Sequence, residues 1–207
     1  SLAVIGSGAQ ARGQVRATAT VREFETVDVF SPTREHRERF ATELDDRLDA
    51  HTRPVESSAA AVEGADVVIT ATNANRPVFE GDLLEPGTHV TAMGQYNPQK
   101  FELDATTIER STYVVDLRER VDLDAGSYIN AVDAGAVPAD HVHAELGEVV
   151  AGNRPGRRSA DEITVFDSGG TGIETVAGAQ LLYEKAQQRD LGTEIEFSPA
   201  SEALTGK

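Results

Sequence analysis

The first residues of the chain contain a closely spaced set of small side chains that could hold a phosphate. Gly6, Gly8 and Ala11 follow directly after the apolar run at residues 2–5, and a segment rich in helix formers comes next. In a strand–turn–helix unit, the first glycine permits the sharp turn, the second lets the backbone approach a pyrophosphate, and the third small residue lets the helix pack on the strand. The free N–H groups and the positive end of the helix then face the phosphates. The spacing predicts a dinucleotide-binding turn, and the alternative is an ordinary glycine-rich turn.

The end of the next predicted strand carries residues that could choose between two dinucleotides. Residues 27–30 predict a strand, and Ser31, Thr33 and Arg34 follow it. This position usually carries Asp or Glu, which accepts hydrogen bonds from the ribose 2′-hydroxyl of NAD. Hydroxyl groups and a guanidinium suit a 2′-phosphate instead, so we expect NADP(H) to be favoured slightly over NAD(H). The alternative is that residues 31–33 cap the following helix and Arg34 is solvated, while Asp28 lies within the strand and should not reach the ribose.

Three further predicted strands end in small polar residues. These ends lie at residues 70–73, 93–100 and 167–169. Ligands of open α/β sheets bind beyond the carboxyl ends of the strands, so we expect the three ends to share one edge with the glycine turn. Each end taken alone is more typical of an ordinary turn.

The histidines give no clear metal or catalytic site. His141 and His143 form an H-x-H pair beside Asp140. We expect a helix at residues 138–150, in which positions i and i+2 do not share a face. The interpretation is therefore a solvated surface pair, and no metal site is expected.

Predicted strands alternate with predicted helices along the chain. This order is typical of an α/β fold, a doubly wound and mainly parallel Rossmann-type sheet with helices on both faces. We expect a dinucleotide-binding domain at residues 1–192 and a C-terminal strand and tail at residues 193–207. The expected strands are residues 2–5, 27–30, 52–55, 66–70, 88–93, 113–116, 163–166 and 193–197. The expected helices follow the glycine turn and lie at residues 33–48, 57–62, 104–110, 138–150 and 173–189.

The composition excludes several classes of function. The 207 residues carry 35 acidic against 19 basic side chains, a net charge of −16, and no cysteine. An acid excess of this size argues against binding nucleic acid through a basic face. No apolar run approaches the roughly 18 residues of a membrane span, and with no signal peptide we expect a cytoplasmic protein without a membrane partner. The acidic surface is interpreted as adaptation to high salt, the alternative being simple self-repulsion that keeps the protein soluble.

Five longer segments resemble the ornithine cyclodeaminase/mu-crystallin family. They are GSGAQA at 6–11, ADVVITATNA at 65–74, PGTHVTAMG at 86–94, ELGEVVAGNRPGR at 145–157 and EITVFDSGGTGIE at 162–174. The resemblance implies a Rossmann domain, a separate dimerising domain built mainly from N-terminal sequence, and a homodimer in the full-length protein. It also implies hydride transfer between bound NAD(H) or NADP(H) and a small amino or imino acid, as in ornithine cyclodeamination, alanine dehydrogenation or ketimine reduction. Because the chain has no initiator Met and opens inside a strand, we expect the N-terminal substrate and dimerisation domain to be absent from it.

The resemblance also implies roles for individual residues. Gly169 would approach the substrate, and the cofactor would contact Gly6, Gly8, Ala9, Gln10, Ser31, Thr33, Arg34, Thr70, Ala71, Thr72, Thr91, Met93, Gly94, Lys100 and Ser168. The cyclodeaminases place a catalytic Asp two residues after the glycine that matches Gly94, where this chain has Tyr96. A tyrosine with a pKa near 10 is a poor base at neutral pH, so an imine reductase or amino-acid dehydrogenase is expected as much as a cyclodeaminase. The alternative is a non-catalytic NADP(H)-dependent ligand-binding protein that keeps the fold.

Overall fold

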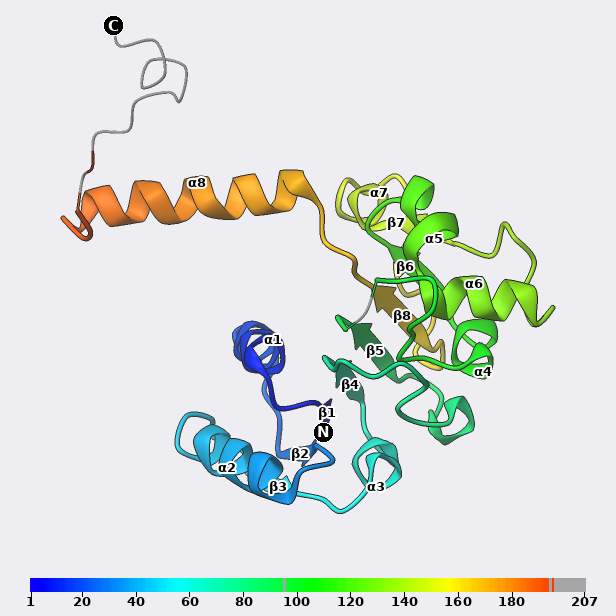
Figure 1. Cartoon of the computed structure of the whole chain (residues 1–207), viewed down its shortest axis with the longest axis horizontal. Coiled ribbons are helices and arrows are strands. Elements are labelled where there is room, and N and C mark those ends of the chain that lie inside the picture. The colour runs from blue at the N-terminus through cyan, green and yellow to red at the C-terminus, as the bar shows by residue number, and fades with distance from the viewer. Residues whose placement is uncertain (95, 194, 196–207) are drawn as a thin grey trace, which may run out of the picture. The chain divides into compact units, whose positions relative to one another are not determined.

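The computed structural model describes residues 1–94, 96–193 and 195, and it divides into two units, Ser1–Gly169 and Gly170–Lys207. The first unit contains an eight-stranded sheet in which every strand pair is parallel (Figure 1). The strand order is β3-β2-β1-β4-β5-β8-β6-β7. The strands are β1 Leu2–Ile5, β2 Thr26–Phe30, β3 His51–Pro54, β4 Val67–Thr70, β5 His89–Ala92, β6 Thr112–Val115, β7 Ala144–Glu145 and β8 Thr164–Asp167. The predicted parallel α/β sheet is confirmed.

Helices connect the strands of the first unit. They are α1 Ala9–Ala19, α2 Arg34–Asp45, α3 Ser58–Val62, the 3₁₀ helix η1 Gly81–Leu83, α4 Ala105–Glu109, α5 Arg118–Asp124, α6 Gly126–Asp133 and α7 Leu146–Val150. The strands β2 and β3 lie in succession on one side of β1, and β4 lies on the other side of β1. This reversal of strand order opens a crevice at the carboxyl end of β1, which is where open α/β sheets bind ligands.

Two apolar clusters lie on opposite faces of the sheet. Leu2 and Val4 of β1 pack with Phe40 of α2 in one cluster, which α1 also joins. Ala3 and Ile5, which alternate with them, belong to the other cluster with residues of α3, α4 and α6. Because β1 is buried on both faces, its sequence is continuously apolar rather than alternating. Helices on both faces of the sheet are therefore confirmed.

The segment between β6 and β8 differs from the expected single helix at residues 138–150. Two helices, α5 and α6, precede it, and only Leu146–Val150 is helical at its end. Residues 141–143 are in neither a helix nor a strand, and the His143 N–H donates to the carbonyl oxygen of Tyr113 on β6, 2.9 Å away. Helix α5 was not predicted from the sequence, because Val121 is the one buried residue of this helix and the helix therefore has almost no apolar stripe.

The prediction of a solvated H-x-H pair is wrong. Nε2 of His141 lies 2.9 Å from the carbonyl oxygen of Ile108, and Nε2 of His143 lies 2.8 Å from that of Pro155. Both residues are half-buried, and their hydrogen bonds attach the loop before β7 to Ile108 and Pro155. Among the described residues, no group of three or more His, Asp or Glu side chains is arranged to hold a metal ion.

The described part of the second unit is dominated by α8, Gly172–Gln188. Its first turn is closed by a capping box, in which the Thr171 hydroxyl accepts from the Glu174 N–H and the Glu174 carboxylate accepts from the Thr171 N–H. The helix expected at residues 173–189 is thus confirmed. Of the strand expected at residues 193–197, residues 194, 196 and 197 lie outside the described residues, as do residues 198–207 of the expected tail. The division at residue 192 stays a prediction.

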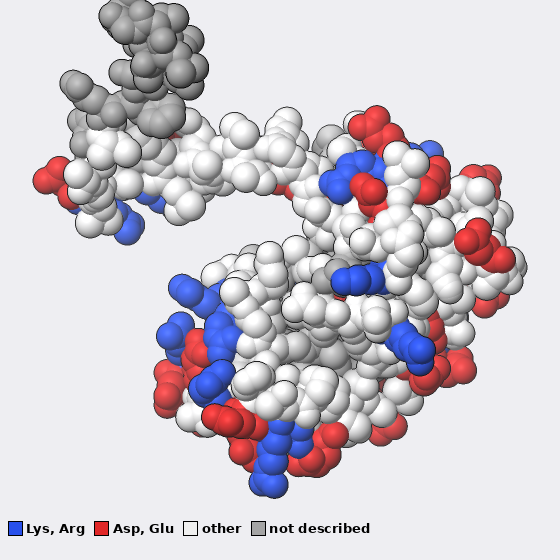
Figure 2. All heavy atoms as spheres, in the orientation of Figure 1, with Lys and Arg blue, Asp and Glu red and all other residues white. Residues whose placement is uncertain are grey.

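The surface charges follow the composition. On the face drawn in Figure 2, acidic side chains lie among and beside the basic ones. Several basic groups are already neutralised locally, for example Arg53, which makes two hydrogen bonds of 2.8 and 2.7 Å to the Asp28 carboxylate. None of the helices in the described part of the chain is long and apolar enough to cross a bilayer.

Candidate functional site

The carboxyl ends of six strands lie in register along one edge of the sheet. Ile5 of β1 pairs with Phe30 of β2 on one side and with Thr70 of β4 on the other. The register continues from Thr70 to Ala92 of β5, then to Asp167 of β8 and to Val115 of β6. The segments that follow these residues therefore share one edge, as expected from the sequence.

The glycine turn at this edge is held by close backbone packing. Gly6 has a φ of +118°, and a Cβ at this position would lie 2.3 Å from the carbonyl oxygen of Ala71. The Gly6 N–H donates to the carbonyl oxygen of Phe30, 2.9 Å away. Because β1 ends against both neighbouring strands, only a glycine can leave it in this direction.

The absence of a side chain at Gly8 matters for a different reason. It is the N-cap of α1, has an ordinary extended backbone, and has no atom within 4 Å of a Cβ position. Its missing side chain therefore leaves open space directly in front of the first N–H groups of α1, which have no partner within the helix. Ala9 and Gln10 supply the next N–H groups. This arrangement fits the phosphates of a dinucleotide.

Arg12 fixes the shape of the glycine turn. Its guanidinium donates to the carbonyl oxygens of Ser7 and Gly8, and its Nε donates to Glu43 over 2.8 Å. The same group lies 4.6 Å from the centre of the Phe40 ring, within the range of a cation–π contact. This role could not be predicted from local sequence patterns, because the contacts to α2 connect residues about thirty positions apart.

The predicted discriminator residues lie at the end of β2 and start of α2. Ser31 is buried, and its hydroxyl accepts a hydrogen bond of 3.1 Å from the Ser7 hydroxyl. Arg34 is exposed and donates to Glu38 over 2.7 Å. Thr33 is the N-cap residue of α2, as the capping alternative expected, although its hydroxyl makes no capping hydrogen bond. Asp28 stays within β2, as expected.

The ends of β4 and β5 bring together most of the other predicted cofactor residues. Ala71 and Thr72 follow β4, while Met93 and Gly94 follow β5, and the Met93 N–H donates to the carbonyl oxygen of Thr70 over 2.8 Å. Thr91 is an exception, because its hydroxyl contacts Nε2 of His89 at 3.1 Å on the face of the sheet. Its side chain is therefore not part of the edge.

Tyr96 lies against Gly169, beyond the ends of β5 and β8. A Cβ on Gly169 would lie 2.5 Å from the Tyr96 ring, so the ring packs directly on the glycine. The guanidinium carbon of Arg120 is 5.0 Å from the centre of this ring. The Tyr96 hydroxyl is buried and has no hydrogen-bond partner among the described residues. Burial, with the negative charges of Asp167 and Asp116, raises the Tyr96 pKa well above its ordinary value.

Two buried carboxylates lie behind this tyrosine. Burial raises the pKa of Asp167 to about 7, although the hydrogen bond from the Tyr113 hydroxyl opposes the shift. Asp116 is also buried and accepts a hydrogen bond of 3.1 Å from the Ser168 hydroxyl. The edge near Ser168 therefore holds a protonatable carboxyl group close to neutral pH.

Lys100 lies on the loop that follows Tyr96. It is exposed, and its N–H donates to the carbonyl oxygen of Asn97 over 3.0 Å. The loop rests on the start of α6, since a Cβ on Gly126 would lie 2.4 Å from the carbonyl oxygens of Asn97 and Lys100. The backbone of Lys100 is thus fixed while its side chain reaches solvent.

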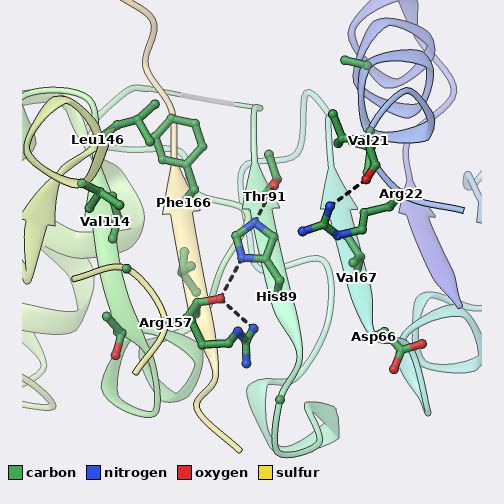
Figure 3. Close-up of a pocket in the computed structure, with 18 of the residues that line it drawn as sticks. Val21, Arg22, Asp66, Val67, His89, Thr91, Val114, Leu146, Arg157 and Phe166 are labelled. Atoms are coloured by element: carbon green, nitrogen blue, oxygen red, sulfur yellow. Dashed lines mark hydrogen bonds between the residues drawn. The ribbon is translucent and has the colours of Figure 1, made fainter. Parts of the chain in front are cut away.

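A groove of about 970 Å³ lies elsewhere, on the face of the sheet (Figure 3). Its walls are mainly apolar and include Val67, Leu146 and Phe166. His89 in its floor contacts the Thr164 and Thr91 hydroxyls, and burial lowers its pKa to about 4. The ring is therefore neutral at neutral pH, and the groove holds none of the glycine-turn residues.

Comparison with known proteins identifies the chain's family. A family pattern described as the ornithine cyclodeaminase/mu-crystallin family matches residues 1–190. The chain belongs to this family. It is 35% identical to a Delta(1)-pyrroline-2-carboxylate reductase from Bacillus cereus over 198 residues, which are 95% of this chain and 61% of that protein.

Solved structures of family members have the same fold. The Delta(1)-pyrroline-2-carboxylate reductase of Thermococcus litoralis, solved with NADH and L-proline, is 38% identical with a TM-score of 0.87. An archaeal alanine dehydrogenase dimer with bound NAD is 33% identical with a TM-score of 0.85. The matches cover 94% and 95% of this chain, but only 60% of each of those chains. The chain therefore spans about three fifths of the length of these relatives.

Three residues near the site in this family member, Arg12, Glu102 and Asp116, were not predicted to have a role there. Arg12 contacts α2, and the Glu102 carboxylate accepts hydrogen bonds from Thr70 and Thr72 at the end of β4; such contacts between distant segments are not revealed by a single sequence. Asp116 directly follows the apolar strand β6, and an acid at the end of a buried strand was the available signal. Asp167 belongs to the strand end at residues 167–169 that was expected at this edge.

Proposed function

We propose that residues 1–190 bind a nicotinamide dinucleotide across the ends of β2, β1, β4 and β5. The observation that carries this proposal is Gly8, which caps α1 with open space before it at the point where the strand order reverses. Membership of the ornithine cyclodeaminase/mu-crystallin family supports the same conclusion. The N–H groups of Ala9 and Gln10 would hold the pyrophosphate, and the strand ends would hold the two riboses.

We further propose that the whole protein reduces an imine, or oxidises an amine, in a small amino or imino acid. Bound nicotinamide supplies or accepts the hydride in such a reaction. The chain's residues would position the ring near Ser168 and exclude water on the side of Tyr96. The relatives that act as a Delta(1)-pyrroline-2-carboxylate reductase and an alanine dehydrogenase support this class.

The environment of Tyr96 favours these activities over cyclodeamination. A cyclodeaminase needs an acid–base group where this chain has Tyr96, and a tyrosine whose pKa is raised by burial and neighbouring carboxylates cannot accept a proton at neutral pH. Its hydroxyl is also buried rather than exposed to a substrate. We therefore propose a reductase or dehydrogenase, with a homodimer as its assembly.

Two observations favour NAD(H), although the hydroxyl groups near the end of β2 favoured NADP(H) in the sequence. Arg34 is paired with Glu38, and the Ser31 hydroxyl is buried against Ser7. The solved relatives were bound to NADH and NAD. We propose NAD(H) as the cofactor, with NADP(H) as the alternative that a direct titration decides.

A fluorescence titration with NADH tests the binding proposal. Gly8→Ala should leave the melting temperature unchanged, because the backbone is ordinary and the space is open, yet weaken NADH by more than about tenfold by blocking the pyrophosphate. Gly13→Ala is the matched control, since Gly13 also has nothing within 4 Å but lies inside α1. Equal affinities for the Gly8 and Gly13 variants would contradict the proposal.

A second candidate function is a non-catalytic dinucleotide-dependent binding protein, which the replacement of the family Asp by Tyr96 supports. Cofactor oxidation separates the two candidates. The whole protein should oxidise NADH when given Delta(1)-pyrroline-2-carboxylate, or pyruvate with ammonia. Tight NADH binding with no oxidation by any small imino acid would favour the binding protein.

A further inference from the structure

Glu102 is a buried carboxylate that lies between the ends of two neighbouring strands. Its residue is 3% exposed, although it belongs to neither strand and follows the loop at residues 97–100. Its carbonyl oxygen accepts from the Val78 N–H over 2.8 Å, and the next residue, Leu103, is fully buried. The backbone therefore holds the carboxylate in one place.

The carboxylate accepts hydrogen bonds from both strand ends. Oε2 accepts from the Thr70 hydroxyl over 2.9 Å, and Oε1 accepts from the Thr72 N–H over 2.7 Å, both at the end of β4. The Gly94 N–H at the end of β5 also donates to it. A Cβ on Gly94 would lie 2.1 Å from the carboxylate carbon, so the glycine is required for this approach.

A carboxylate is a costly choice for this place if its purpose is stability alone. Burial without hydrogen bonds strongly destabilises an ion, and well-packed apolar side chains often stabilise a fold as well as a buried charge does. The carboxylate also orients the strand ends, because two backbone N–H groups and one hydroxyl point toward its oxygen atoms. The strand ends it joins are those expected to line the cofactor.

The strand order predicts which half of a bound dinucleotide would contact the ends of β4 and β5. Ser31 follows β2 on one side of β1, whereas Thr72 and Gly94 follow β4 and β5 on the other side. A dinucleotide crosses the sheet edge at β1, with its adenosine half toward β2 and its nicotinamide half toward β4 and β5. Glu102 is therefore attached to one half of the proposed site only.

We infer that Glu102 is the positioning residue of the nicotinamide half of the site: its carboxylate fixes the ends of β4 and β5 in the arrangement that receives the nicotinamide riboside. This inference rests on the proposed dinucleotide binding. The carboxylate touches no reacting atom and acts through Thr70, Thr72 and Gly94.

The test compares NADH with ADP, which lacks the nicotinamide riboside. In Glu102→Ala, NADH should bind about tenfold more weakly, because hydrogen bonds to a charged group that held the strand ends are lost. ADP should bind within about twofold of the unsubstituted chain, since the β1 and β2 side is intact. Glu102→Gln keeps one acceptor oxygen and should fall between the two. Amide exchange at residues 70–74 should become faster without any ligand.

Controls separate positioning from general loosening. Glu109→Ala removes an exposed acid of α4 and should change neither affinity. If Glu102→Ala does not fold, Glu102→Gln and Thr70→Val must show the same selective loss of NADH. Equal weakening of NADH and ADP, or no weakening of either by the folded variants, overturns the inference. If the unsubstituted chain binds neither ligand, the proposed function fails and the inference falls with it.

Discussion

The Tyr113 hydroxyl donates a 2.5 Å hydrogen bond to Asp167, and both side chains are buried in the same apolar layer. The hydrogen bond alone would lower the pKa of the carboxyl group. Burial outweighs it, and the charges of Glu102 and Asp116 act in the same direction as burial, so the Asp167 pKa rises from an ordinary 3.8 to about 7. The end of β8 thus carries a carboxyl group that changes its charge near neutral pH.

The first prediction concerns stability and pH. Since the folded pKa of Asp167 lies above its ordinary value, its contribution to stability is fully present below about pH 4 and is lost as the pH rises through about 7. Asp167→Asn still accepts from Tyr113 but cannot ionise. It should therefore lose less stability between pH 5 and 8 than the unsubstituted chain, by on the order of 2–4 kcal/mol.

Urea unfolding at several pH values measures this difference. Asp161→Asn is the matched control, because Asp161 is exposed just before β8. It should retain the pH dependence of the unsubstituted chain. Parallel pH profiles for the Asp167 and Asp161 variants would mean that Asp167 titrates normally.

The second prediction concerns the two buried tyrosine hydroxyls. The Tyr96 hydroxyl has no partner among the described residues, so Tyr96→Phe should keep or raise the free energy of unfolding. Tyr113→Phe removes the donor to Asp167 and should lower it by about 1–3 kcal/mol. Urea unfolding at pH 6 compares the Tyr96 and Tyr113 variants.

The Tyr96 variant also tests the proposed reaction. In the whole protein, Tyr96→Phe should keep the imine reductase activity, and loss of that activity would indicate that the Tyr96 hydroxyl donates a proton in the reaction.

The third prediction concerns the choice of dinucleotide. Ser31→Asp should raise the NADH over NADPH affinity ratio by about tenfold or more, because a carboxylate repels a 2′-phosphate and accepts from a 2′-hydroxyl. Arg34→Ala should leave NADH binding unchanged, since Arg34 is paired with Glu38. Titration of both variants with both cofactors gives the answer. A selective loss of NADPH affinity in Arg34→Ala would mean that Arg34 leaves Glu38 to bind the phosphate.

The sequence predicted the parts of this fold that depend on local pattern. Short apolar runs such as residues 2–5 indicated buried parallel strands, and the glycine spacing at Gly6 and Gly8 indicated the turn. It failed between β6 and β8, where α5 has one buried residue and His143 is fixed by a hydrogen bond to Tyr113 on β6. It also missed Glu102, whose importance comes from Thr70 and Gly94, brought to it by the parallel pairing of β4 and β5.

The fourth prediction concerns salt. A net charge of −16 on 207 residues makes the folded chain repel itself at low ionic strength. Screening of ordinary surface charge is nearly complete by about 0.2 M salt, where the Debye length is below about 10 Å. Adaptation to high salt predicts that the melting temperature continues to rise between about 0.2 and 2 M KCl, beyond the range in which screening acts. A melting temperature that levels off at the lower concentration would favour the simpler interpretation of self-repulsion.

The last prediction concerns what the 207-residue chain can do alone. The proposed cofactor contacts are local to the sheet edge of the first unit, so NADH should bind to this chain. Turnover needs a substrate held near the nicotinamide in attack geometry, and such positioning can supply roughly 7–11 kcal/mol of barrier reduction. The chain spans 61% of the related Bacillus cereus reductase, and we expect the substrate-holding groups to lie in the remainder. NADH oxidation by residues 1–207 with Delta(1)-pyrroline-2-carboxylate, or with pyruvate and ammonia, should therefore be undetectable while fluorescence still reports binding. Robust oxidation by this chain would instead place the substrate site within it, and Tyr96 and Gly169 would be the first residues to substitute.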